Sequence, residues 1–205
     1  MLQCEPKTQK SKHTKAKILS VAKYVFEKKG FQKATVKDIT IAAGLGYGTF
    51  YLYFKDKKEV FVALVEQVED ELFTVADDGS DLEKDYERGI NSYRALRKDL
   101  KSILKSFQSN SSILKFSKEL ALLDAEFQKK YEAVRSRLIK RTKQILEKSG
   151  LEAVNLDVAA VAIAGMIEAV ATDWTNTNDP NSICSKASQE EILPTLTKLY
   201  FKAVS

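Results

Sequence analysis

Apolar residues recur at helical spacing along most of this chain. In the first such stretch they fall at i, i+1, i+4, i+7 and i+8, which predicts a helix with one buried face over residues 14–29. Gly30 follows this stretch, where a left-handed cap would end the helix. The 205 residues contain only three prolines and eight glycines, so long helices are expected rather than many short strands. The apolar positions of the first helix are Ile18, Leu19, Ala22, Val25 and Phe26.

The same pattern continues toward the end of the sequence and predicts an all-α fold. Residues 175–187 are polar and contain Pro180, which predicts a loop before the last helix. Proline is tolerated only in the first turn of a helix, so Pro194 favours a start for that last helix later than Ser188 suggests. The further helices are expected at residues 36–42, 47–53, 56–75, 81–97, 99–109, 111–122, 124–149, 157–175 and 189–204.

Positive charge is concentrated in the first 60 residues. The whole chain has a net charge of +5, but residues 1–60 carry 13 lysines, no arginine and five acidic residues, a net charge of +8, and the remainder carries −3. A basic N-terminal part indicates a partner with phosphates. Because lysine is a point charge, this set favours phosphate attraction over paired hydrogen bonds to guanine. Five lysines that precede or begin the first helix form either a flexible arm for phosphates or a solubilising tail: Lys7, Lys10, Lys12, Lys15 and Lys17.

The composition excludes several classes of site. Two cysteines (Cys4 and Cys184) and one histidine (His13) supply neither a disulfide framework, nor a four-ligand zinc site, nor a histidine-dependent triad. The sequence has no run of about 18 apolar residues that would span a membrane, and its first residues lack the apolar core of a signal peptide. We therefore expect no enzymatic activity, no metal site and no cofactor, and a cytoplasmic location.

Residues 35–54 have the pattern of a helix-turn-helix. Thr35 and Asp38 have the spacing of a capping box, which predicts the start of a short helix. Residues 43–46 (Ala-Gly-Leu-Gly) predict a tight turn, where small residues are needed because the two helices cross at a steep angle. Gly48, on the second helix, lets the backbone approach a surface such as the DNA major groove. The residues expected to close the small core are Ile39, Leu45, Phe50 and Phe54.

The segments ATVKDI (residues 34–39) and AGLGYGTFYLYFKDK (residues 43–57) resemble the DNA-binding signature of the tetracycline-repressor (TetR/AcrR) family. The likeness covers residues 14–61, about a quarter of the chain. The sequence departs from the family pattern at Gly46, where serine or threonine usually caps the second motif helix. The resemblance implies an N-terminal three-helix domain with the helix-turn-helix over residues 1–56. A larger helical domain for ligand binding and dimerisation is implied over residues 57–205.

The resemblance also implies roles for individual residues in DNA binding. Thr35 and Lys57 would contact phosphates at the N-termini of their helices, and residues 47–49 would face base edges and backbone. Tyr51 and Tyr53 would contact phosphates or thymine methyl groups. The alternatives are helix capping alone for Thr35, ordinary packing for the two tyrosines and a solvated surface position for Lys57. The predicted DNA-binding residues are Thr35, Val36, Gly46, Tyr47, Gly48, Thr49, Tyr51, Tyr53 and Lys57.

The remaining chain lacks a catalytic grouping and is suited to sensing and dimerisation. Residues 157–175 form a helix that is apolar nearly all round, and Ala160, Ala164 and Ala171 permit close approach of another helix. Together with residues 189–204 this helix is expected to form a homodimer interface, with burial inside one subunit as the alternative. Aromatic and apolar residues are candidates for a ligand pocket, with plain core packing as their alternative: Tyr93, Phe107, Phe116, Phe127, Tyr131, Met166 and Trp174.

Taken together, these features predict a ligand-responsive, DNA-binding transcriptional regulator. We expect a homodimer that represses transcription from a pseudo-palindromic operator and is released by a small hydrophobic or amphipathic molecule. One alternative is a transcriptional activator, or an architectural DNA binder without ligand control. The other is an enzyme or structural helical protein that carries a helix-turn-helix without using it.

Overall fold

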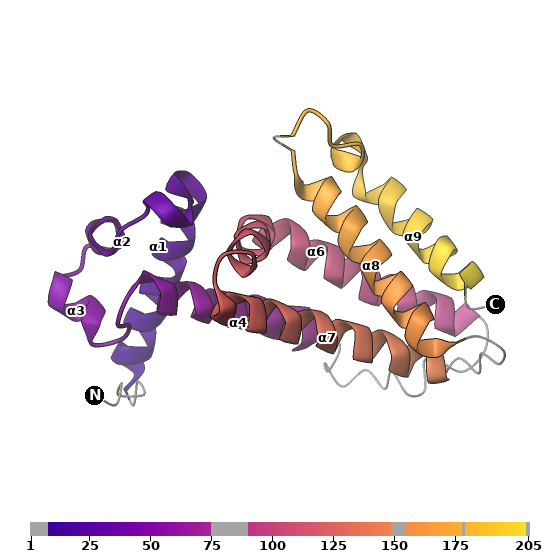
Figure 1. Cartoon of the computed structure of the whole chain (residues 1–205), viewed down its shortest axis with the longest axis horizontal. Coiled ribbons are helices and arrows are strands. Elements are labelled where there is room, and N and C mark those ends of the chain that lie inside the picture. Colours follow the sequence, from indigo (N-terminus) through magenta and orange to yellow (C-terminus); the bar gives the residue numbers. More distant parts are fainter. Residues whose placement is uncertain (1–7, 75–89, 149–154, 178, 204–205) are drawn as a thin grey trace. The chain divides into compact units, whose positions relative to one another are not determined.

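A computed structural model of the chain describes residues 8–74, 90–148, 155–177 and 179–203, and within these ranges the protein is helical without strands (Figure 1). This confirms the predicted all-α fold. Of the helix expected at 81–97, residues 81–89 lie outside the described ranges and residues 90–97 belong to α6. The elements are α1 (Gln9–Lys33), α2 (Val36–Ala43), α3 (Tyr47–Tyr51), α4 (Lys57–Thr74), α6 (Ile90–Ala121), α7 (Ala125–Lys148), α8 (Leu156–Thr175), the short 3₁₀-helix η1 (Cys184–Lys186) and α9 (Gln189–Ala203).

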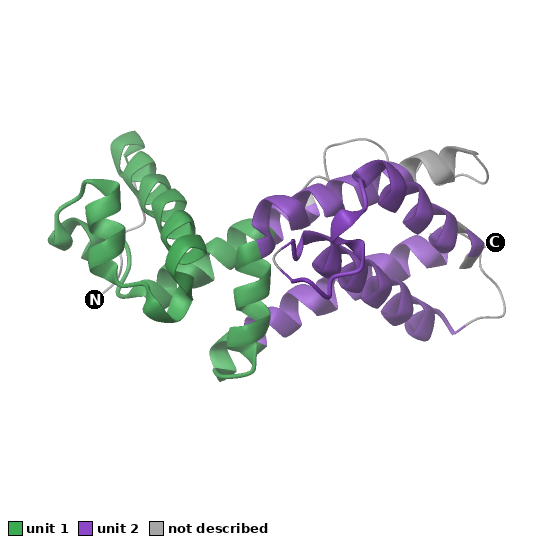
Figure 2. Cartoon of the chain, turned by 90° about the horizontal axis from the view of Figure 1, so that it is seen from above, with its two compact units in different colours: residues 1–68, 112–128 green, residues 69–111, 129–205 purple. Residues whose placement is uncertain are grey.

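The chain forms two compact units, and three helices contribute to both of them (Figure 2). Unit 1 comprises residues 1–68 and 112–128, and unit 2 comprises residues 69–111 and 129–205. Helices α4, α6 and α7 therefore each pass from one unit into the other. These compact units are not the two domains expected from the sequence, so the domain boundary predicted after residue 56 stays a prediction.

The core of unit 1 is an aromatic cluster drawn from α1, α4 and the first turn of α7. Phe61 lies at the centre, with its ring centroid 5.8 Å from that of Phe26, 5.1 Å from that of Phe31 and 5.5 Å from that of Phe127. Phe26 and Phe61 are completely buried. Edge contacts between such rings add to the stabilisation that their burial provides. The N-terminal helices and the α6–α7 corner therefore share one hydrophobic core.

Helix α1 begins five residues earlier than the sequence pattern predicts. Thr8 caps it, because the Thr8 side chain accepts a hydrogen bond from the Ser11 N–H at 3.2 Å. As a result Lys10 and Lys12 are fixed on a helix rather than placed in a flexible arm, whereas Lys7 lies outside the described residues. Gly30 has the positive φ that was expected (74°), but with ψ 154° it makes a kink inside α1, which continues to Lys33, so the predicted end of the helix at Gly30 is wrong.

Helix α6 bends where one predicted break lies and is continuous at another. Asn110 has non-helical angles (φ −125°, ψ 17°), and its buried side chain donates to Glu71 Oε2 at 2.8 Å and to the Ser106 carbonyl at 3.1 Å. The break expected between residues 97 and 99 is wrong, because Asp99 lies inside the helix, buried and 3.4 Å from Arg141. The carboxylate of Asp99 can be buried inside the helix because Arg141, on another helix, pairs with its charge.

Helix α8 packs into unit 2 through one apolar face, and α9 runs beside it (Figure 1). The buried residues of α8 include the three alanines predicted to allow close helix approach, so these alanines pack inside the subunit. None of the described helices has an apolar stretch long enough to cross a membrane. The buried face consists of Ala160, Ile163, Ala164, Ile167, Ala171 and Trp174.

Helix α9 begins at Gln189, so the later start predicted from Pro194 is wrong. The residue before the helix sets its start: the Ser188 N–H donates to Glu191 Oε2 at 2.8 Å, and the Ser188 hydroxyl donates to the same oxygen at 3.1 Å. These bonds are one half of a capping box, in which an acid at the third helical position satisfies the backbone of the cap. The cap outweighs the single hydrogen bond that Pro194 cannot donate.

Candidate nucleic-acid interface

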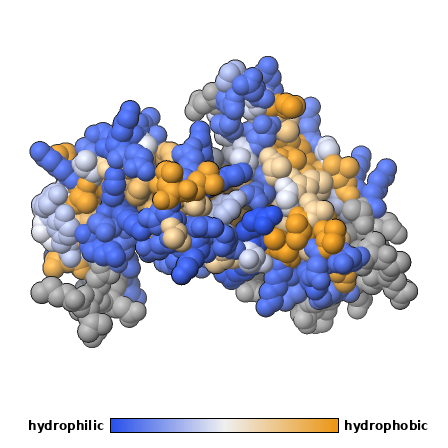
Figure 3. All heavy atoms as spheres, in the orientation of Figure 1, coloured by the Kyte–Doolittle hydropathy of each residue, from blue (hydrophilic) through white to orange (hydrophobic). Residues whose placement is uncertain are grey.

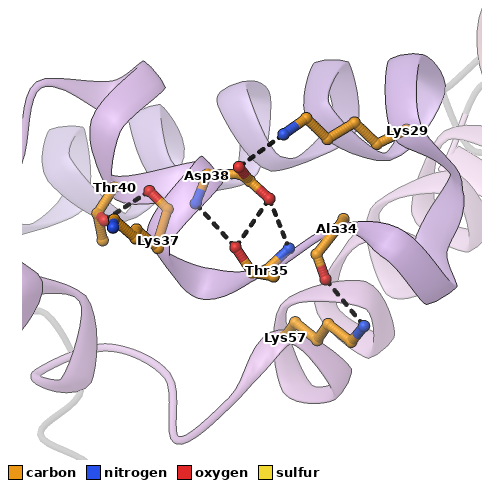
Figure 4. A network of polar contacts seen from close by, with 7 residues as sticks. All are labelled: Lys29, Ala34, Thr35, Lys37, Asp38, Thr40 and Lys57. Carbon is orange, nitrogen blue, oxygen red and sulfur yellow. Dashed lines mark hydrogen bonds and ion pairs between the residues drawn. The ribbon is translucent and has the colours of Figure 1, made fainter.

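The start of α2 is held by a complete capping box (Figure 4). The Asp38 N–H donates to Thr35 Oγ1 at 3.1 Å, and Asp38 Oδ2 accepts from the Thr35 N–H at 3.0 Å and from the Thr35 hydroxyl at 2.8 Å. Lys29 on α1 donates to the other carboxylate oxygen of Asp38 at 2.6 Å. Thr35 itself is exposed, so it caps the helix and still faces solvent.

Because of these bonds, this region is expected to become less stable at acidic pH. The hydrogen bond from Lys29, followed by those from Thr35, lowers the pKa of Asp38 to about 2 from 3.8. A carboxyl group with a lowered pKa stabilises the folded state above its unfolded pKa, and this contribution is lost as the pH falls from about 4 to about 2. We expect the melting temperature of the wild type to fall more over this pH interval than that of Asp38→Asn, whose side chain does not titrate. Equal pH dependence of the two proteins, measured by circular dichroism, would contradict this role.

The turn between α2 and α3 depends on a glycine. Gly44 is left-handed (φ 60°, ψ 39°), which an L-residue with a Cβ adopts only with strain, and its N–H donates back to the Ile41 and Thr40 carbonyls. Gly46 then caps α3 without any side-chain hydrogen bond, and its carbonyl accepts from the Thr49 N–H at 2.9 Å. The predicted tight turn is confirmed, and it fixes the direction in which α3 leaves α2.

Helix α3 buries one face and exposes the other. Phe50 and the following Phe54 are almost completely buried and form the inner face with Ile39 of α2. On the outer face Tyr47 is 53% exposed and Tyr51 is 47% exposed, and the Tyr51 hydroxyl lies 3.4 Å from that of Tyr47. Gly48 is exposed and Thr49 half-buried. The structure therefore places the predicted residues Tyr47, Gly48, Thr49 and Tyr51 on one short, accessible helix.

Two predicted residues instead make contacts inside unit 1. The Tyr53 hydroxyl accepts a hydrogen bond from the Ser11 hydroxyl on α1 at 3.2 Å. The Lys57 ammonium donates to three backbone carbonyls at the end of α1. Phosphate contacts of both residues stay predictions. Ser11 was not predicted, because 42 residues separate it from its partner and no local pattern marks it.

The seven residues predicted for a ligand pocket are distributed over both units, and their role in a pocket stays a prediction. Phe116 and Phe127 belong to unit 1, where Phe127 packs in the aromatic cluster, and the Tyr93 side chain lies outside the described residues. The candidates in unit 2 are half-buried or buried. They are Phe107, Tyr131, Met166 and Trp174.

Tyr131 and Trp174 in unit 2 are both hydrogen-bonded. The Tyr131 hydroxyl donates to Glu168 Oε1 at 2.6 Å, and burial together with this carboxylate raises the pKa of Tyr131 to about 12. The Trp174 indole N–H donates to the Ala187 carbonyl at 2.9 Å, which ties α8 to the loop after η1. Tyr131 therefore combines a polar group with an apolar body, whereas Trp174 has a clear structural function.

Residues 18–64 match the family model described as "Bacterial regulatory proteins, tetR family". The HTH-type transcriptional regulator YfiR of Bacillus subtilis, itself described as uncharacterized, is 43% identical over 56 residues, which is 27% of each chain. The HTH-type transcriptional regulator EthR of Mycolicibacterium smegmatis is 28% identical over 131 residues, which is 64% of this chain and 58% of that protein. The chain thus matches about a quarter of the length of YfiR and less than two thirds of EthR.

Solved structures share the fold over nearly the whole chain. A TetR-family transcriptional regulator from Syntrophomonas wolfei, described as putative in its name, has a TM-score of 0.73 at 20% identity, covering 95% of this chain and 96% of that one. The regulator FadR of Bacillus subtilis, in complex with stearoyl-CoA, has a TM-score of 0.68 at 19% identity, covering 93% and 99% of the two chains. At these identities the likeness shows the fold alone. The helix-turn-helix part of the chain thus matches the model of the tetR family, and the chain as a whole shares its fold with solved structures of TetR-family regulators.

Proposed function

We propose that this protein is a DNA-binding transcriptional regulator that acts as a homodimeric repressor and is released from its operator by a small hydrophobic or amphipathic molecule. The observation that carries this proposal is the accessible outer face of α3, which presents Tyr47, Gly48, Thr49 and Tyr51 beyond a turn fixed by Gly44. A helix of this kind enters the major groove of duplex DNA.

DNA binding would combine base contacts from α3 with phosphate attraction from the lysines of unit 1. Tyr47 and Thr49 have polar groups near the start of α3, and Gly48 between them leaves room for the DNA backbone or a base edge. Thr35 is exposed at the N-terminus of α2, where the helix dipole favours an anion. Exposed Lys37, in the first turn of the same helix, adds a positive charge there. Affinity would therefore fall steeply with salt.

The dimer would form through the outer face of α8 together with α9. The one charged side chain on the exposed part of α8 is Asp157 in its first turn, which pairs with Lys143 at 2.7 Å, and the two valines there, Val158 and Val161, are 64% and 44% exposed. Leu199 on α9 is 50% exposed, and apolar atoms gather over these two helices (Figure 3). A two-fold axis would bring the same face of two subunits together and align their α3 helices with successive major grooves. The exposed positions of α8 are Asp157, Val158, Val161, Ala162, Ala169 and Thr172.

The effector would bind in unit 2. Phe107, Met166 and Tyr131 provide apolar surface, and Tyr131 with Glu168 adds one polar pair. The FadR structure named above contains stearoyl-CoA, and its shared fold supports an effector with a long apolar part for this chain. The effector would release DNA only if it bound more tightly to a dimer state that does not fit the operator. A promoter reporter with and without the protein distinguishes repression from activation.

The proposal predicts that Tyr47→Ala weakens specific DNA binding about tenfold or more, because a base contact is worth about 1–3 kcal/mol. Duplexes are first selected from a random-sequence pool with the wild-type protein. Fluorescence anisotropy then measures the affinity of each variant for the selected duplex and for an unrelated duplex, over a range of salt concentrations. The loss is expected on the selected duplex only.

The matched control is Tyr24→Ala, because Tyr24 is 57% exposed on α1 outside the helix-turn-helix. This variant is expected to bind the selected duplex like the wild type. If no duplex is enriched from the pool, or if Tyr47→Ala and Tyr24→Ala bind alike, α3 is not the DNA-reading helix. An affinity that is independent of salt would contradict binding through phosphates.

A further inference from the structure

Lys57 has all three of its ammonium hydrogen bonds inside the protein. It is the first residue of α4, and its Nζ lies 2.9 Å from each of the carbonyl oxygens of Phe31, Gln32 and Ala34. A lysine ammonium has three N–H donors and no more. The ring of Phe31 also lies below the charge, with its centroid 4.9 Å from Nζ.

The three carbonyls belong to the end of α1 and its cap. Carbonyls at the end of a helix lack partners within it and carry the negative end of the helix dipole, so a cation stabilises them. Lys57 is partly withdrawn from water at this place, and burial lowers its pKa. Contact with a DNA phosphate would require the ammonium to give up at least one of these bonds.

The same bonds determine where α2 begins. Ala34 is the cap of α1, and the next residue, Thr35, is the cap of α2 (Figure 4). Lys57 therefore holds the junction of α1 and α2 against the start of α4 from one side. Lys29 holds Asp38 in the capping box at 2.6 Å and fixes α2 to α1.

We infer that Lys57 is a positioning residue for DNA binding, which sets the orientation of the helix-turn-helix on α1 and α4 and does not itself bind a phosphate. The expected effect of Lys57 on DNA affinity rests on the proposed function. Its effect on the protein alone does not depend on DNA.

The inference is tested with Lys57→Gln, Lys57→Arg and the control Lys55→Gln, which removes an exposed lysine two residues away. Affinity for the selected duplex is measured as a function of salt. Lys57→Gln is expected to bind about tenfold more weakly, as for the loss of charge-assisted hydrogen bonds, with the same salt slope as the wild type. Lys57→Arg should bind as weakly, because a planar guanidinium does not direct three N–H bonds at these carbonyls.

A phosphate contact makes the opposite predictions. It requires Lys57→Gln to reduce the salt slope by about 1 relative to the wild type, and Lys57→Arg to keep most of the affinity. Either result overturns the inference. If Lys57→Gln fails to fold, as judged by circular dichroism, Lys57→Arg decides the question.

A measurement without DNA separates this inference from the proposed function. Amide hydrogen exchange at Ala34 and Asp38 is expected to be about tenfold faster in Lys57→Gln than in the wild type or Lys55→Gln, because the junction loses its support. Unchanged exchange at both amides overturns the inference even if DNA binding is lost. If the wild type binds no duplex, faster exchange still supports a positioning role, and the proposed function alone fails.

Discussion

Replacing Phe61 by alanine is expected to lower the free energy of unfolding by about 3–5 kcal/mol, the cost of deleting a buried aromatic ring and leaving a cavity. Phe61 is completely buried, and its ring contacts those of Phe26, Phe31 and Phe127. Because whole domains are stable by only about 5–15 kcal/mol, this loss is a large part of the total. Specific DNA binding should be lost with it, since the cluster is the core of unit 1, which contains the helix-turn-helix.

Denaturant unfolding followed by circular dichroism measures the loss. Phe61→Leu keeps most of the volume and should cost about 1.5 kcal/mol or less. Leu52→Ala, at a side chain that is 68% exposed, should change stability by about 0.5 kcal/mol at most. A loss below about 1 kcal/mol for Phe61→Ala would mean that the cluster is not the core of unit 1.

The helix-turn-helix could be predicted from the sequence because its determinants are local. The capping box at Thr35 and Asp38 spans three residues, and the turn needs a left-handed glycine at one position, Gly44. Each of these features constrains its own few residues whatever surrounds them. The break at Asn110 was also predictable, because an asparagine competes locally for backbone hydrogen bonds.

The contacts that sequence reasoning missed join residues far apart in the chain. Lys57 reaches carbonyls 23 to 26 residues earlier, and Lys58 pairs with Asp124, 66 residues later, at 2.9 Å. Phe127 fits the description of a pocket residue in sequence, but it packs with Phe31 and Phe61 of unit 1. A lysine or an aromatic residue gives no local sign of such a partner, because tertiary packing alone decides it.

The apolar helix expected at residues 157–175 has one face that packs inside the subunit and another that is exposed. Hydrophobicity all round predicts burial on several sides but does not say which side faces the same subunit. In the structure Ala160, Ala164 and Ala171 face inward, and the exposed face has Val158 and Val161. The interface prediction therefore moves to the other side of the same helix, where its effect on assembly can be tested.

Val161→Glu is expected to convert the proposed dimer to monomers and to weaken operator binding about 100-fold or more. A glutamate on the outer face of α8 would bring two like charges close to a two-fold axis and desolvate them. The helix-turn-helix units of the two subunits would then bind DNA independently. The gain in affinity from linking two binding sites, about 10²–10⁴, would be lost. Sedimentation equilibrium measures the mass, and fluorescence anisotropy on the selected duplex measures the affinity.

Ala133→Glu is the matched control, since Ala133 is exposed on α7 and acquires the same charge. It should stay dimeric and bind DNA like the wild type, whereas Leu199→Glu, on the exposed part of α9, should resemble Val161→Glu. The predicted pattern links assembly to affinity: variants that lose the dimer lose the operator, and a monomeric variant keeps only weak, salt-sensitive binding through its own lysines. A dimeric Val161→Glu protein with wild-type affinity would place the interface elsewhere on the surface.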